Sequence, residues 1–235
     1  MKTKIIFFFL IVNFFASCKK EIPASIKVKV EYENKLNKEL PKLYTLWVYK
    51  NGKIFKKFSR FEKPYIAKEI VIDSLNNGKY KFVYLNFLNQ TLEKSIVIKE
   101  NKVYSITINP DYSNFRKFIS GSSIRNLQKG QKIEILFVRN SCMGSSEGNM
   151  TITNDGNDFI AESHGMIKKL NQKEIDLLIK MECELNLLQY GGCTTSDHYI
   201  IKSGNLKKEF YDRTCAWEGW TNTYKEMNWK IKNGS

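Results

Sequence analysis

Seven short apolar runs fill residues 26–109, and none of them has the period of a helix. In the first run Ile26, Val28 and Val30 alternate with Lys27 and Lys29, which is the period of a strand with one face in water. The other runs lie at residues 44–50, 53–58, 65–72, 79–87, 94–98 and 103–109. Seven strands at this spacing predict a β-sandwich.

Turn signals separate these runs, and the clearest is Asn51-Gly52, which is typical of a two-residue hairpin. The stretch from residue 72 to 84 resembles the Leu-x-x-Gly-x-Tyr segment of transthyretin-like and carboxypeptidase-regulatory-like sandwiches, with Leu75, Gly78 and Tyr80 at the motif positions. The resemblance implies that the glycine makes a turn and that the tyrosine starts the next inward face. Such domains are spacers or adhesive modules and bring no catalytic residues.

The second half changes from the period of strands to that of helices and back. A strand is expected at residues 132–139, and a hairpin of 149–154 with 157–162 is expected across Asp155-Gly156. Asn171 and Glu174 predict a capping box at the start of a helix. The apolar stripe of that helix is Leu178, Met181, Leu185 and Leu188.

A further hairpin is expected at residues 196–203 and 206–212 around Gly204-Asn205. A terminal helix follows, with an aromatic face formed by Trp217, Trp220, Tyr224, Met227 and Ile231. We therefore predict a mainly β chain of α+β character, in which a seven-stranded sandwich at residues 25–110 precedes a linker at 111–130. A small antiparallel sheet packed with two helices is expected at 131–235.

Residues 1–17 have the pattern of a cleavable export signal. Lys2 and Lys4 precede an apolar run at residues 5–12, which ends well short of the roughly 20 residues that a spanning helix needs. Phe15-Ala16-Ser17-Cys18 resembles the lipobox of bacterial lipoproteins, although Phe15 stands where leucine is usual. The resemblance implies cleavage before Cys18, palmitate-type acylation of Cys18 and a short tether at 18–24. The alternative is an ordinary secretory signal that leaves Cys18 unmodified.

Lipidation would make the membrane the first partner and the cell envelope the location. Lys19 stands where an aspartate retains many Gram-negative lipoproteins in the inner membrane, which favours the outer membrane, on its periplasmic or its surface face. The formal charge is +14, and without Lys2 and Lys4 it is +12. The lysines alternate along strands and do not cluster on a helix, so nucleic acid is not an expected partner.

Four cysteines remain after Cys18, and all of them lie in the second half: Cys142, Cys183, Cys193 and Cys215. In an oxidising compartment an even number favours disulfides. A three-residue turn at the 196–212 hairpin would set Cys193 directly opposite Cys215, so this pair is the expected disulfide. A second disulfide between Cys142 and Cys183 is the alternative to two free thiols.

No catalytic group of residues stands out. Asp197 and His198 are neighbours on a strand and point to opposite faces, so they cannot orient one another. His164 lies in a predicted loop, and no histidine or cysteine pair has the spacing of zinc ligands. The sequence therefore predicts no enzyme, no cofactor and no metal, while a zinc site or a nucleophilic Cys142 are the sharper alternatives.

Trp229 lies off the aromatic stripe of the terminal helix, and an exposed Trp229 would suggest a weak binding site for sugar rings. The chain is therefore expected to be a lipid-anchored envelope protein that acts as a binding module for an envelope protein or a polysaccharide. Two alternatives remain: an inhibitor or immunity protein directed against a hydrolase, and an unrecognised hydrolase.

Overall fold

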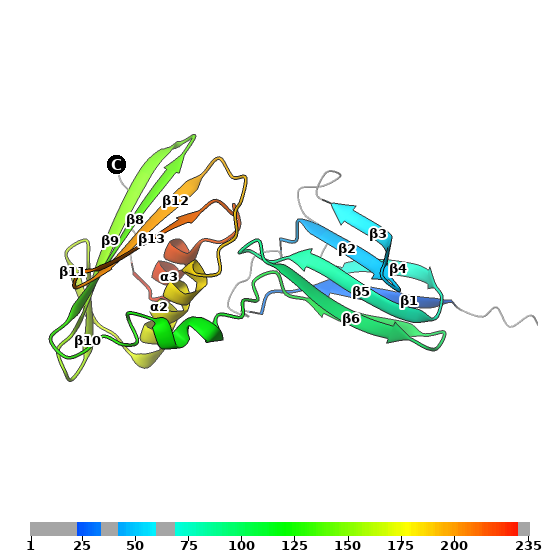
Figure 1. Cartoon of the computed structure of the whole chain (residues 1–235), viewed down its shortest axis with the longest axis horizontal. Coiled ribbons are helices and arrows are strands. Elements are labelled where there is room, and N and C mark those ends of the chain that lie inside the picture. The colour runs from blue at the N-terminus through cyan, green and yellow to red at the C-terminus, as the bar shows by residue number, and fades with distance from the viewer. Residues whose placement is uncertain (1–22, 34–41, 60–68, 230–235) are drawn as a thin grey trace, which may run out of the picture.

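The computed structural model describes residues 23–33, 42–59 and 69–229. Figure 1 shows two bodies, a sandwich of two sheets followed by a larger sheet that is covered by helices on one face. Each body has its own cluster of buried apolar side chains. The predicted mainly β architecture is therefore confirmed.

The N-terminal body contains the seven predicted strands in two sheets. The three-stranded sheet has the order β4-β1-β7 and the four-stranded sheet has the order β3-β2-β5-β6. The strands are β1 (Ala24–Val30), β2 (Thr45–Lys50), β3 (Lys53–Ser59), β4 (Glu69–Leu75), β5 (Gly78–Leu85), β6 (Thr91–Ile98) and β7 (Val103–Ile108). β1 pairs antiparallel with β4 and parallel with β7.

Apolar and polar side chains alternate along the strands, so each sheet buries its apolar face in the sandwich. In β1 the side chains of Ile26, Val28 and Val30 are fully buried, whereas Lys27 and Lys29 are exposed. Asn51 and Gly52 both have positive φ values, as the predicted two-residue hairpin turn requires. Gly78, with φ +148°, begins β5, and Tyr80 points into the core, as the sandwich motif implied.

The second body is a six-stranded antiparallel sheet with the order β11-β10-β9-β8-β12-β13. Its strands are β8 (Lys132–Ser141), β9 (Gly144–Asn154), β10 (Phe159–Ser163), β11 (Met166–Lys169), β12 (Ser196–Ser203) and β13 (Leu206–Asp212). The helices are η1 (Arg116–Gly121), α2 (Gln172–Leu185) and α3 (Gly219–Glu226). Figure 1 shows α2 and α3 together on one side of this sheet.

Helix α2 begins where the sequence predicts it. The Asn171 side chain accepts a hydrogen bond from the Glu174 backbone, and the Glu174 side chain accepts one from the Asn171 backbone, so the capping box is confirmed. Leu178, Met181 and Leu185 are buried against the sheet.

Two local predictions were wrong, and one strand was not predicted. β9 begins at Gly144, five residues before the predicted strand at 149–154, because β8 and β9 pair as far as Ser141 and Gly144. β9 and β10 pair Asn154 with Phe159, so the turn is four residues long. The Asp155 carboxylate closes this turn by accepting hydrogen bonds from two following backbone amides. The strand β11 was not predicted, because it is only four residues long.

Residues 111–130 pack onto the second body and do not form a loose linker. Ile124 is fully buried and Leu127 is 4% exposed, both in the core under α2 and the sheet. Leu88, from the turn between β5 and β6, belongs to the same core. The Gln189 amide donates a hydrogen bond to the Leu88 carbonyl at 2.9 Å. The two bodies are therefore joined by packed side chains as well as by the chain itself.

Candidate functional site

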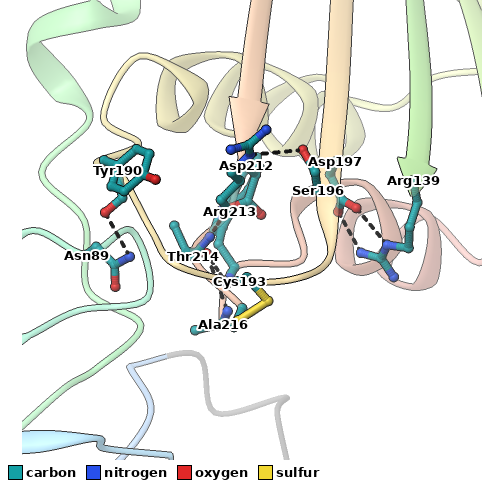
Figure 2. The surroundings of a disulfide bond; sticks show 12 residues. Asn89, Arg139, Tyr190, Cys193, Ser196, Asp197, Asp212, Arg213, Thr214 and Ala216 are labelled. Atoms are coloured by element: carbon teal, nitrogen blue, oxygen red, sulfur yellow. Dashed lines mark hydrogen bonds and ion pairs between the residues drawn. A yellow bond between two sulfur atoms is a disulfide. The ribbon is translucent and has the colours of Figure 1, made fainter. Parts of the chain in front are cut away.

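The predicted disulfide between Cys193 and Cys215 is confirmed, with the two Cα atoms 5.3 Å apart. Figure 2 shows it beyond the ends of β12 and β13. The register from which it was predicted is wrong. β12 and β13 pair Ser203 with Leu206, so the turn has two residues and the ladder ends at Asp197 and Asp212.

The two cysteines lie outside the paired residues of β12 and β13, and hydrogen bonds in these irregular segments bring them together. The Asp212 carboxylate accepts a hydrogen bond from the Thr214 amide at 2.8 Å, and the Cys193 amide donates to the Arg213 carbonyl at 3.2 Å. Cys215 itself has a positive φ of 63°. This irregular segment shifts the cysteines back into reach of one another.

Cys142 and Cys183 do not form the second disulfide. Cys142 is an exposed thiol in the turn between β8 and β9, and Cys183 is a buried thiol on α2. Burial, reinforced by the neighbouring Glu182 and Glu184 carboxylates, raises the pKa of Cys183 to about 11. Cys183 is therefore an inert thiol of the core.

A buried charge cluster lies next to the disulfide (Figure 2). The Arg139 guanidinium donates to both carboxylate oxygens of Asp197, at 2.8 and 2.6 Å, and the Asp197 side chain is 3% exposed. Asp212 lies opposite Asp197 on β13 and is also buried. Burial raises the pKa of Asp212, and the Asp197 charge raises it further. The cluster fixes the ends of three strands: both carboxylates are buried, and the Arg139 side chain is 29% exposed.

The other buried carboxylates of the described residues also bind to the protein itself. Glu182 accepts hydrogen bonds from the Ser122 hydroxyl and from two backbone amides, and thereby holds residues 122–124 on α2. Glu184 lies in a cleft of about 310 Å³ between the two bodies. It accepts from the Ser113 hydroxyl at 2.6 Å and from the Trp217 indole at 2.9 Å. These carboxylates hold residues 113–124 and Trp217 on α2, and their oxygens already accept hydrogen bonds from the protein.

The two histidines are far from one another in the fold. His164 occupies the tight turn between β10 and β11 with a positive φ. The His198 Nε2 atom lies 3.0 Å from a Glu209 carboxylate oxygen, and its ring stacks on Tyr211. Asp197 points to the other face of β12, as the strand period requires. Within the described residues, no group of three His, Cys, Asp or Glu side chains could hold a metal ion.

The aromatic residues near the C-terminus form part of the core. Trp217, Trp220 and Tyr224 are all buried, and Trp220 stacks on Phe137 of the sheet. Trp229 is 8% exposed and packs edge-on against Tyr224. The prediction that Trp229 could be an exposed sugar-binding side chain is therefore wrong. Cys18 and Ile231 lie outside the described residues.

One surface has the composition of a binding site, namely the face of the six-stranded sheet that lies opposite α2 and α3. At its centre Leu136 and Ile200 are paired across β8 and β12, and Val138 lies beside them. These three side chains are half-buried and belong to neither core cluster. Ile160, Ile167 and Tyr211 are further apolar side chains nearer the edges of this face, and Ile167 and Tyr211 are 72% and 58% exposed. The polar side chains of Asn149 and Thr151 on β9 separate the first two from the centre. We call the six apolar residues the open sheet face.

Charged side chains of both signs surround this apolar centre. Glu134 and Lys202 are paired across β8 and β12, and Glu147 lies opposite Val138. The ring of His198 and the Glu209 carboxylate, on the same side of the sheet, are held together. An apolar centre with a polar rim is the usual anatomy of a protein interface.

Two apolar runs in the sequence indicate this face, although the strands were predicted without them. Residues 135–138 are Ile-Leu-Phe-Val and residues 199–201 are Tyr-Ile-Ile, with no alternation. Continuous apolar runs are typical of strands that are buried on both faces. Here the inner side chains Ile135, Phe137, Tyr199 and Ile201 pack under the helices, whereas no helix of the described residues covers the outer ones.

No model of a known protein family matches this chain, and no curated protein matches its sequence. Among the described residues there is no helix long and apolar enough to cross a membrane.

Proposed function

We propose that this chain is a lipid-anchored protein of the bacterial cell envelope that binds another envelope protein through the open sheet face. The observation that carries the proposal is the apolar centre formed by Leu136, Val138 and Ile200, which packs against neither core cluster. Half-exposed aliphatic side chains at the middle of a sheet lose unfavourable contact with water when a partner covers them.

A protein fits this face better than a polysaccharide does. Aliphatic side chains bury well against other aliphatic or aromatic side chains, and the centre of this face, formed by Leu136, Val138 and Ile200, offers no aromatic ring on which a sugar could stack. The rim carries Glu134 and Glu147 as well as Lys202, so it suits a partner whose own charges are mixed.

An Ile200→Glu variant should lose the partner but keep its stability if the open sheet face is the binding surface. Its side chain is outside both cores, so the variant should unfold at nearly the same temperature as the wild type. We expect that the partner captured from detergent-solubilised envelopes by the wild type is lost, because an unpaired carboxylate would have to be buried at the centre of the interface.

The matched control is Val71→Glu on β4, where the side chain is 45% exposed. It also replaces an aliphatic side chain by glutamate, but outside the open sheet face. It should retain the partner. Capture of the same partner by wild type and Ile200→Glu would contradict the proposed binding surface.

The export signal and Cys18 support the anchor. We expect a palmitate analogue to label the chain in growing cells and a Cys18→Ala variant to lose both the label and its place in a membrane fraction washed at high salt. The disulfide between Cys193 and Cys215 is in keeping with an oxidising compartment. A Cys18→Ala variant that is labelled and fractionates like the wild type would rule out lipidation.

A second candidate function is inhibition of a hostile hydrolase. The observation in its favour is the turn between β8 and β9, where Met143 is 97% exposed at the end of a long hairpin. A protruding loop of this kind could enter an active-site cleft. The capture experiment distinguishes the two functions, because one tightly bound hydrolase that is lost on Met143→Asp would identify an inhibitor.

A further inference from the structure

Lysine side chains gather at one end of the sandwich, the end at which β1 begins. Three turns meet there, at residues 50–53, 76–79 and 99–102. The Asn51 amide donates to the Lys79 carbonyl at 3.1 Å, and the Ser25 amide at the start of β1 donates to the Lys102 carbonyl at 3.2 Å. Gly78 is paired with Ile98, which joins the second turn to the third. The turns and the first residues of β1 therefore form one continuous surface.

The charge of this surface is strongly positive. Its twelve turn residues include five lysines, and Glu100 is the one acid among them. The lysines are Lys50, Lys53, Lys79, Lys99 and Lys102. Glu100 binds Lys102 at 2.8 Å, whereas Lys53, Lys79 and Lys99 are exposed and form no ion pair with the described residues. We call these five residues the basic end.

Two of the connections at the opposite end of the sandwich, residues 86–90 and 109–112, contain no lysine or arginine and one aspartate. These connections face the second body, where Leu88 enters its core. The start of β1, and with it the basic end, points away from the second body, as Figure 1 shows.

Exposed aliphatic side chains lie beside the lysines. Ile54 follows the first turn and is 67% exposed, Val103 follows the third and is 57% exposed, and Val97 is paired with Lys79 and is 49% exposed. Lysines mixed with exposed aliphatic groups suit a lipid surface, which offers anionic headgroups and an apolar layer below them. A polyanionic sugar would satisfy the lysines alone.

The position of the proposed lipid anchor supports the same partner. Cys18 precedes Ala24, the first residue of β1, by six residues, and six residues span at most about 20 Å. The chain thus enters the sandwich at the basic end. From this geometry we propose that the basic end docks on an anionic phospholipid surface, so that the sandwich stands on the membrane and the open sheet face is held away from it.

The location of this surface in the cell rests on the proposed anchor at Cys18, but its affinity for lipid does not. The test therefore uses the chain from residue 18 onward with Cys18→Ser, which carries no acyl group. This protein should sediment with vesicles of equal parts phosphatidylglycerol and phosphatidylcholine at low salt, and it should be released at high salt. It should not sediment with vesicles of phosphatidylcholine alone.

A triple variant, Lys53→Gln, Lys79→Gln and Lys99→Gln, should bind the anionic vesicles about 100-fold more weakly, at roughly fivefold for each lysine. The control carries Lys29→Gln, Lys173→Gln and Lys207→Gln, which remove the same charge elsewhere on the surface, and it should bind like the parent protein.

Equal losses in the triple variant and its control would overturn the proposal, because net charge alone would then explain binding. Binding to alginate without binding to the vesicles would overturn it in favour of an anionic polysaccharide. Failure of palmitate labelling at Cys18 would refute the anchor and leave the vesicle result standing, so the two proposals fail separately.

Discussion

An Arg139→Met variant is expected to lose about 3 kcal/mol of stability, because it leaves a buried carboxylate without its cation. Asp197 is 3% exposed and receives both hydrogen bonds of the Arg139 guanidinium, and Asp212 lies directly opposite it. Two buried carboxylates would then face one another with no guanidinium beside them. Urea unfolding, followed by the fluorescence of the buried tryptophans, would measure the loss.

The loss should depend on pH in a definite direction. Burial raises the pKa of Asp212, and the Arg139 charge partly opposes this, so removal of Arg139 raises the pKa of Asp212 further. A carboxyl group with a raised pKa in the folded state stabilises the fold at low pH, and that contribution is lost as the pH rises through the folded pKa. The deficit of Arg139→Met should therefore be largest at neutral pH and should shrink toward about pH 4, the ordinary pKa of aspartate.

A second substitution tests the electrostatic origin of this loss. Adding Asp197→Asn to Arg139→Met removes one charge with little change in shape, and we expect the double variant to recover more than half of the lost stability. A double variant as unstable as Arg139→Met would show that packing of the arginine side chain, and not the uncompensated charge, is responsible.

The sequence predicted those features that depend on neighbouring residues. The alternation in β1, the hairpin at Asn51-Gly52 and the capping box of Asn171 and Glu174 each involve residues within a few positions of one another. Patterns at this range are set by the geometry of a single strand, turn or helix end. All three are present in the structure where they were predicted.

Features that join distant residues could not be predicted in the same way. Arg139 and Asp197 are 58 positions apart, and they meet only because β8 pairs with β12. The sequence does not say which strand lies beside which, so neither the charge cluster nor the open sheet face could be assembled from it. The burial of Ile124 likewise depends on α2, whose Glu182 binds residues 122–124.

The disulfide between Cys193 and Cys215 was predicted correctly from an incorrect register. A regular ladder would have needed a three-residue turn to bring the cysteines together, but the turn has two residues. The difference is made up after the ladder ends, where Asp212 binds the Thr214 amide and Cys215 adopts a positive φ. Such an irregular segment has no period and therefore leaves no pattern in the sequence.

A variant with Cys193→Ser and Cys215→Ser is expected to lose about 3 kcal/mol of stability in the chain-entropy account of disulfides. The bonded cysteines are 22 positions apart, and the loop between them contains the hairpin of β12 and β13. Without the bond, the unfolded chain gains the freedom of this loop. Urea unfolding of the oxidised wild type and the double variant would measure the difference.

Two comparisons isolate the bond itself. Cys142→Ser, at an exposed free thiol, should change stability by less than about 0.5 kcal/mol, because no packing is lost there. Wild type treated with a reductant should unfold like the double variant, since both lack the same crosslink. If the reductant leaves the unfolding curve of the wild type unchanged, the hairpin and the charge cluster alone hold this end of the sheet, and an oxidising compartment would not be needed for its stability.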